Sequence, residues 1–348
     1  MTPGQREHAD AFGAWLRNPK SAALQARLWD VERKNASGAS DAAGGFLVPE
    51  ILVRDIERRV RNENPLRQFA RVLPVGSADV KLPMTNNDAG TSWAGENDTR
   101  NATAEPTGRQ ATPTFGSIYA YVTASEELVN DAIFPIAEWF GQSVADAMAE
   151  AEADAFVSGN GTKKPTGFLN AAPVATGDAD SPARAAGVLQ YVPTGAAYST
   201  AAPFGELSTA SPAFHPSDAF VDLVYSLRSQ YRRNAAWFMS SATTGAVRKL
   251  KDADGRPLWT DSMAAGQPPL LLGFPVVTLE AMPAVGVNAH PIAFGDMARA
   301  YSICDVGGLR VTMDEVTMPG FVRWHIRRRL GGCVVNDDAL KVLKLAAS

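Results

Sequence analysis

Apolar side chains recur every three or four positions along residues 125–158, the longest helical pattern in the chain. The apolar stripe comprises Ile136, Phe140, Val144, Met148, Ala151 and Ala155. The opposite face is acidic and comprises Glu138, Asp146, Glu150, Glu152 and Asp154. Gly159-Asn160-Gly161 follows directly, a combination typical of a helix C-terminus. These residues predict one long amphipathic helix with a carboxylate-bearing face.

Residues 66–122, which precede this helix, are rich in strand-forming residues with Pro and Gly between them. The middle of the stretch, residues 85–113, is polar and has no helical period. A connection of that length is usually functional, disordered or a long two-stranded arm. We expect residues 76–113 to form a two-stranded projection with few contacts in their own subunit. The alternation of Tyr119, Tyr121 and Thr123 then predicts a returning strand.

The second half alternates strands with short helices. Helical patterns cover residues 217–233 and 241–251, and strand patterns cover 236–239, 275–277, 292–294, 301–303 and 321–345. Residues 170–215, rich in Ala, Gly, Pro, Ser and Thr, read as a loop insertion. At the other end, residues 5–33 and 50–61 read as helices joined by a flexible linker at 35–45.

Composition excludes several classes of protein. Among 348 residues, 33 Lys and Arg face 37 Asp and Glu, so the net charge of −4 makes a sequence-specific DNA binder a poor fit. The charged fraction is only 20%, which suits a surface largely covered by partners. No apolar run is long enough to span a membrane, and no signal peptide is recognisable. We expect Cys304 and Cys333 to be reduced thiols in a cytoplasmic product.

No catalytic motif stands out. The four histidines lack metal-site spacing, and the chain has no H-E-x-x-H, C-x-x-C or G-x-S-x-G. Residues 159–164 lack the spacing of a phosphate loop. Residues 252–255 lack the remaining ligands of an EF-hand. We therefore expect no catalytic, cofactor-binding or metal site.

Arg327-Arg328-Arg329 is the most concentrated charge in the tail. Because neighbouring residues of a strand point to opposite faces, Arg327 and Arg329 should share one face and Arg328 the other. The three could meet phosphates or carboxylates of a neighbouring chain, and we favour the carboxylates.

A series of short motifs runs from residue 44 to residue 332 in a fixed order. They are GGFLVP at 44–49, WAGE at 93–96, EADAF at 152–156, GNG at 159–161, PTGFL at 165–169, AWFM at 236–239, LKD at 250–252, GRPLW at 255–259, LGFPV at 272–276, FGD at 294–296, Tyr301 and RLGG at 329–332. This order resembles that of the major capsid proteins of tailed bacteriophages, with the Hong Kong 97-type fold. Capsid proteins of gene transfer agents share the pattern.

The resemblance implies an α+β fold with an N-terminal arm, an extended β loop, a peripheral domain with a long spine helix, and an axial domain. The implied segments are an N-terminal helical segment and arm (1–65), the extended loop (66–122), the peripheral domain with spine helix and loop insertion (123–214), the axial domain (215–308) and a C-terminal return to the peripheral domain (309–348). We expect Trp93 and Glu96 in the loop, together with Arg327, Arg328 and Arg329, to serve assembly.

The implied function is structural rather than enzymatic and needs no cofactor. Hexamers and pentamers of the chain would build an icosahedral head around double-stranded DNA, which is bound without sequence specificity. Further implied partners are a portal, a scaffold or maturation protease and decoration proteins, with no membrane. Assembly would take place in the host cytoplasm and end in the virion capsid.

Two other functions stay open at this point. An encapsulin-like nanocompartment would have the same fold with cargo enzymes instead of a genome. A hydrolase or nucleotide-binding enzyme would need a convergent polar pocket, for which the sequence gives no residues.

The resemblance also bears on covalent maturation. Some relatives join a Lys of the extended loop to an Asn of the peripheral domain with help from a Glu. This chain has no Lys between Leu82 and Thr162, and residues 321–335 contain no Asn or Glu. We therefore expect no such cross-link. Only 43 residues precede Gly44, too few for a helical scaffolding domain, so we expect a separate scaffold or a trimmed chain, with any cleavage near residues 34–37.

Overall fold

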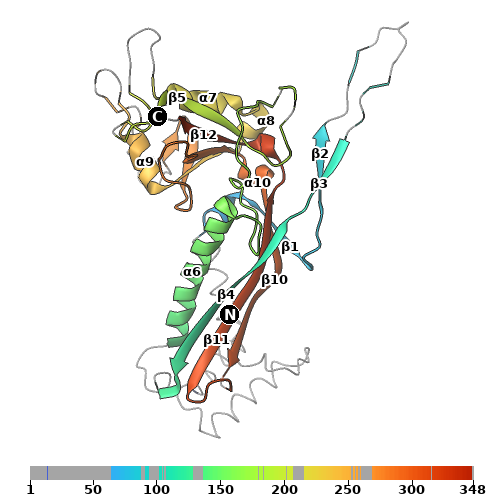
Figure 1. Ribbon diagram of the computed structural model, residues 1–348, viewed down its shortest axis with the longest axis vertical. Helices are drawn as coiled ribbons and strands as arrows, with labels where there is room; N and C mark the ends of the chain where they lie inside the picture. The colour runs from blue at the N-terminus through green and yellow to red at the C-terminus, as the bar shows by residue number, and fades with distance from the viewer. Residues whose placement is uncertain are drawn as a thin grey trace. The chain divides into compact units, whose positions relative to one another are not determined.

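The computed structural model describes residues 64–346 with internal gaps, and Ala14 before them (Figure 1). The larger gaps are 88–90, 94–101, 128–135, 207–214 and 260–268, beside several single or paired positions. The expected N-terminal helices, linker and arm lie outside the described residues, and so does Glu96.

Helices and strands alternate along the described chain, so the expected α+β class is confirmed. The first elements are α4 (Leu66–Phe69), β1 (Arg71–Val75), β2 (Leu82–Asn87), β3 (Thr107–Ala111), β4 (Thr114–Ser125) and the long helix α6 (Ile136–Ser158). Next come β5 (Gln190–Ala197), α7 (Asp218–Ser226), α8 (Ser229–Arg232), β6 (Ala236–Met239), α9 (Ser241–Arg248), β7 (Leu270–Leu271) and β8 (Phe274–Thr278). The last are β9 (Ile292–Gly295), α10 (Met297–Ala300), β10 (Tyr301–Asp314), β11 (Phe321–Val334), the 3-10 turn η2 (Asp337–Ala339) and β12 (Leu340–Ala346).

The described strands form three sheets. One has the order β1-β10-β11-β4, one has the order β5-β12-β9-β6-β8-β7, and β2 pairs with β3 as a separate two-stranded sheet. The β2–β3 pair is antiparallel and joins, for example, Met84 to Arg109. The expected two-stranded pairing around the polar segment is therefore present.

The chain divides into two compact units. In its described part, the first holds Ser117–Glu152 and Gly307–Arg329. There α6 lies along β4, β11 and β10 (Figure 1), with one core formed by Val144, Ala145, Met148, Ala149, Leu309, Val311 and Ile326. A second cluster of Ala124, Val322 and Trp324 continues this layer, with Phe140 packed against it. The unit is thus a helix on one face of a sheet, and the sheet's other face carries the alternate residues of each strand.

The second unit holds Pro65–Gly116, Ala153–Val306 and Leu330–Ser348 and contains the six-stranded sheet. Its central strands β6 and β9 are entirely buried, as expected for the AWFM and IAFG runs. Trp237 anchors this core, its ring 4.4 Å from that of Phe294 and 5.9 Å from that of Phe220 on α7. Side-chain caps begin two short helices: Ser240 accepts from Thr243 N at α9, and Asp296 accepts from two backbone N–H groups at α10.

Two strands belong to the six-stranded sheet against expectation. β5 lies within the stretch interpreted as a loop insertion, and it pairs in parallel with β12. β12 in turn pairs antiparallel with β9, so residues 340–346 share a sheet with the segment 215–308. The sequence of β5, QYVPTGAA, has little apolar alternation, and only the buried strand beside it specifies its extended form.

The Gly331-Gly332 pair is buried, and both residues continue β11. A Cβ at position 332 would lie 2.1 Å from the hydroxyl oxygen of Tyr301. Glycine at this position therefore lets a fully buried tyrosine pack against the strand backbone. The Tyr301 hydroxyl donates to the carbonyl of Thr166 at 2.7 Å.

Candidate functional site: a basic sheet face and a buried charge network

The three adjacent arginines of β11 alternate in burial, as the strand period predicts. Arg327 and Arg329 are exposed, whereas the Arg328 side chain is 2% exposed. Arg328 Nη1 lies 3.3 Å from Oε1 of Glu152, which is itself fully buried on α6. This arginine therefore pairs within its own chain. Only Arg327 and Arg329 remain for a neighbour, and within the described residues neither makes an ion pair.

The helix register places Glu152 in the core and Ala151 at the surface, the reverse of the expected assignment. Position 152 is four residues after Met148 and three after Ala149, and both are buried, so it falls on the same helix face. Arg328 makes a buried carboxylate tolerable there, because burial of an unpaired charge is very costly. Glu152 is therefore not part of the acidic exposed face.

The sheet face directed away from α6 is basic and aromatic. We call it the basic face; its residues are Tyr119, Tyr121, Arg310, Arg323, His325, Arg327 and Arg329. The Tyr121 and His325 rings meet edge to face at 4.4 Å between centroids, and the Tyr119 ring lies 5.3 Å from that of Tyr121. Both tyrosines are more than 60% exposed. Four cations and two large aromatic rings thus share one sheet surface.

Asp314 is the carboxylate nearest to this face within the described residues, and it is already engaged. Its Oδ1 accepts from Val316 N at 3.0 Å and from Thr317 N at 3.1 Å. The hydrogen bonds from Thr317, and then that from Val316, lower the pKa of Asp314 to about 2. His325 Nε2 lies 3.8 Å from its other oxygen. Asp314 therefore stays ionised near neutral pH, and within the described residues its ion-pair partner is His325 rather than one of these arginines.

The exposed side of α6 carries the opposite charge. Asp146, Glu150 and Asp154 are exposed at intervals of four residues, and we call them the acidic row. Beside them run the small exposed residues Ser143, Ala147 and Ala151, and Trp139 at the start of the helix is 56% exposed. The helix therefore offers a line of carboxylates next to a strip without bulky side chains.

Trp93, expected to serve assembly, is completely exposed, and the adjacent Thr91 and Ser92 are also exposed. A tryptophan buries a large apolar area when a partner covers it, so this side chain has the character that the expected role in assembly requires.

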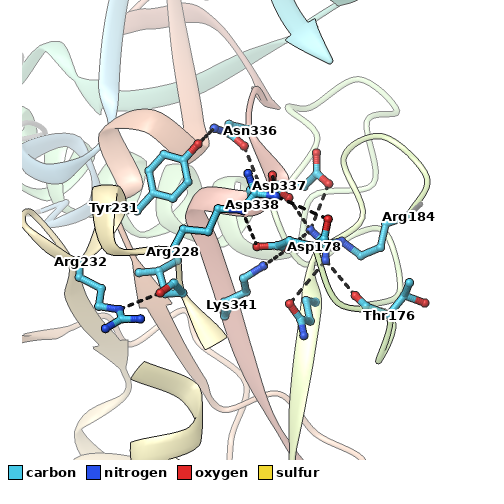
Figure 2. A network of polar contacts seen from close by, with 12 residues as sticks. Thr176, Asp178, Arg184, Arg228, Tyr231, Arg232, Asn336, Asp337, Asp338 and Lys341 are labelled. Carbon is cyan, nitrogen blue, oxygen red and sulfur yellow. Dashed lines mark hydrogen bonds and ion pairs between the residues drawn. The ribbon is translucent and has the colours of Figure 1, made fainter. Parts of the chain in front are cut away.

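A second polar cluster had no counterpart in the sequence analysis. The charge network comprises Asp178, Arg184, Arg228, Asp337, Asp338 and Lys341, three cations with three anions (Figure 2). Arg184 Nη2 lies 2.7 Å from Oδ1 of Asp178 and 2.7 Å from Oδ1 of Asp338. Lys341, fully buried on β12, donates to Asp178. The network thus links Asp178 and Arg184 to Asp338 and Lys341, which lie near the C-terminus.

One signal could have revealed the network. Lys341 sits in the run LKVLKL, where every neighbour at 340–343 is buried, so its cation needs a partner inside the protein. The identity of that partner was hidden because Asp178 is 163 residues away.

Burial by itself would raise the pKa of the Asp178 carboxyl, but the hydrogen bonds and charges of Lys341 and Arg184 outweigh it and lower the pKa. Burial, together with the nearby charge of Asp178, raises the pKa of Asp338. The two carboxylates therefore act in opposite directions on acid stability. Asp178 contributes stability above its unfolded pKa of about 3.9, which is lost as the pH falls through its lower folded value.

The lowered pKa of Asp178 predicts how its contribution to stability depends on pH. The difference in unfolding free energy between the wild type and Asp178→Asn should have its largest value at pH 7. It should decrease as the pH falls below about 4. Denaturant titrations at several pH values measure it. A difference that stays constant down to pH 3 would remove the charge of Asp178 as its cause.

Cys304 and Cys333 are buried free thiols. Burial raises the pKa of both, that of Cys333 to about 12, which makes them poor nucleophiles. In the part of the chain that the structure describes, no group of His, Cys, Asp or Glu side chains is arranged to hold a metal ion. Among those same residues, no helix combines the length and apolar character of a membrane span.

The comparisons with known proteins agree with one another. The phage capsid family model matches residues 44–345. The structure is similar to the "Capsid of native GTA particle computed with C5 symmetry", with 42% identity, a TM-score of 0.71, and coverage of 82% of this chain and 91% of that one. The capsid of the empty GTA particle matches at 42% identity and a TM-score of 0.70, covering 82% and 90% of the two chains.

A more distant likeness shows the fold alone. The chain from Mycobacterium phage Adephagia is 15% identical, with a TM-score of 0.57 and coverage of 82% of this chain and 91% of that one. No curated protein sequence matches the chain. The Hong Kong 97-type fold expected from the motifs is confirmed, and the chain belongs to the phage capsid family.

Proposed function

We propose that this capsid protein forms the shell of a gene transfer agent or tailed-phage particle by closing into pentamers and hexamers around double-stranded DNA. The observation that carries the proposal is the 42% identity, over 82% of the chain, to a GTA capsid solved with fivefold symmetry. A closed shell needs a heterologous contact between copies, in which two different surfaces of the chain meet. The exposed Trp93 and the exposed arginines of β11 are suited to such contacts.

The finer division of the chain is part of the proposal. The helix-on-sheet unit corresponds to the peripheral domain, and the six-stranded sheet corresponds to the axial domain. The pairing of β5 and β12 with that sheet extends the axial domain to residues 190–197 and 340–346. Residues 76–113 correspond to the extended loop, and a portal, a scaffold or protease and decoration proteins are the further partners. Assembly takes place in the host cytoplasm.

Size-exclusion chromatography with negative-stain microscopy tests the proposal. The purified chain, alone or with its scaffold, should give megadalton particles with icosahedral outlines, and particles from the native host should protect DNA from nuclease. Particles filled with a protein cargo instead of DNA would favour the encapsulin-like function. A chain that stays monomeric under all conditions would contradict the proposal.

Particles of this protein are expected to be held without covalent links between chains, because the extended loop has no Lys beyond Leu82 and residues 321–335 contain no Asn or Glu. Boiling in detergent should therefore release a single band at the size of the monomer on a denaturing gel. A ladder of multiples of that mass would contradict the expectation.

A further inference from the structure

The base of the extended loop is held firmly up to the point where the loop leaves its sheet. Arg67 on α4 donates from both Nη atoms to the carboxylate of Asp305 on β10, at 3.0 and 3.1 Å. β1 then pairs in parallel with β10, and the last pair is Val75 opposite Val306. Residues 76–81 belong to no strand, and β2 lies in a separate sheet. The loop therefore leaves the four-stranded sheet after one defined residue pair.

β10 does not end where β1 leaves it. It runs on from Val306 to Asp314, and within the described residues no other strand pairs with that edge of β10. The next residues of the loop, 77–82, include Val80 and Leu82, which favour strands. An edge with free N–H and C=O groups is a template for pairing with such a segment. Continued pairing of the loop along β10 is therefore a competing structure.

Two glycines occupy the point of departure. Gly307 and Gly308 follow Val306 directly, and each has a φ of +71°. A parallel ladder needs a φ of about −120° at each residue, so its hydrogen bonds cannot continue through two residues in the left-handed region. Both glycines are exposed, and a Cβ at position 307 would meet nothing within 4 Å. Glycine is therefore required at position 307 by the backbone conformation and not by a lack of space.

We propose that the Gly307-Gly308 pair ends the pairing of β1 with β10, and so releases residues 76–113 to contact a second copy of the chain. The inference rests on the proposed function, because it names positioning residues for a contact between copies. In a chain without this glycine pair, residues 77–82 would pair with residues 308–313, in the register that β1 already has. The loop would then be held on its own subunit.

The glycine pair could instead serve only the shape of β10, because the chain passes from the second compact unit to the first at Gly307. The observations favour a role for the loop, since the pairing of β1 stops at the residue before Gly307 and the loop continues with strand-forming residues. The two roles predict different hydrogen-exchange rates for residues 77–82.

The test compares two double variants of the full-length chain. Gly307→Val with Gly308→Val disfavours positive φ, whereas Gly307→Asn with Gly308→Asn adds side chains of similar size that tolerate it. The Val variant should lower the yield of particles by roughly a hundredfold, because the contact made by the loop is lost. The Asn variant should stay within about threefold of wild type, since its backbone can keep the same conformation. Circular dichroism checks that both chains are folded.

Hydrogen exchange of the unassembled chain reports on the loop itself. In the Val variant, the amides of residues 77–82 should exchange about tenfold more slowly than in the wild type, because new ladder hydrogen bonds protect them. In the Asn variant they should exchange at the wild-type rate. If the Val variant does not fold, Gly307→Val against Gly307→Asn gives the same comparison, with a slowing of roughly threefold. Unchanged exchange in a folded Val variant would overturn the inference, whatever its yield of particles.

The outcomes separate the inference from the proposed function. Equal and normal yields of particles from the Val and Asn variants refute the role of the glycine pair and leave the proposed function intact. Equal losses from both variants, with unchanged exchange of residues 77–82, assign the pair to the shape of β10 and also refute the inference. A wild type that never assembles refutes the proposed function, and the exchange comparison then decides by itself whether the glycine pair releases the loop.

Discussion

A chain lacking residues 86–110 is expected to fold with nearly unchanged stability and to form no closed shells. The described residues at the centre of this segment, Thr91 to Trp93, are exposed, so their removal takes little packing from the chain. β2 and β3 pair with each other in a separate sheet, so neither larger sheet loses a strand. Assembly, by contrast, would lose the whole surface that the extended loop offers to a neighbour.

Trp93→Ala is the smaller version of this experiment. Its cost to folding should stay within about 0.5 kcal/mol, as for other exposed positions. Its cost to assembly should reach about 2–4 kcal/mol per contact if the ring fills a pocket of a neighbouring copy. Ser92→Ala, at the adjacent exposed position, is the control and should assemble normally. Sedimentation gives the assembled fraction, and normal particles from the deletion would refute the role of the segment.

Asp178→Asn is expected to be the most destabilising single change in the charge network, at about 3–5 kcal/mol. It leaves the cation of Lys341 fully buried without the carboxylate to which it donates. Lys341→Met should cost roughly half as much or less, because Asp178 keeps Arg184 at 2.7 Å and a buried methionine needs no partner. Removing the anion and removing the cation of this buried ion pair are thus expected to lower the free energy of unfolding by different amounts.

Denaturant unfolding of the dilute, unassembled chain measures both variants, with Arg233→Gln as an exposed control of equal charge change to Lys341→Met. The control substitution should leave the free energy of unfolding almost unchanged. If Lys341→Met lowers the free energy of unfolding as much as Asp178→Asn does, the expected difference between removing the cation and removing the anion is wrong.

The local sequence pattern was sufficient to predict an element where all of its residues are buried. The runs at 236–239 and 292–294 are strongly apolar, and both form fully buried strands. The end of the long helix was likewise predictable, because α6 ends at Ser158, directly before the Gly159-Asn160-Gly161 run. In these segments each residue's own chemistry determines its environment.

The local sequence pattern failed to predict the burial or the backbone form of a residue where a partner far along the chain determines them. Alanine fits both core and surface, so the choice between Ala151 and Glu152 depends on Arg328, 176 residues further on. β5 is extended because β12 pairs with it, and its own composition is that of a loop. Only the burial of each side chain distinguishes the exposed carboxylates of α6 from Glu152, and the exposed arginines of β11 from Arg328.

A cryo-EM reconstruction of particles assembled from this chain tests the central claim most directly. It should show a closed icosahedral shell with five copies of the chain around each vertex. An open polymer, or a shell built from another protein with this chain only attached to its surface, would contradict the account.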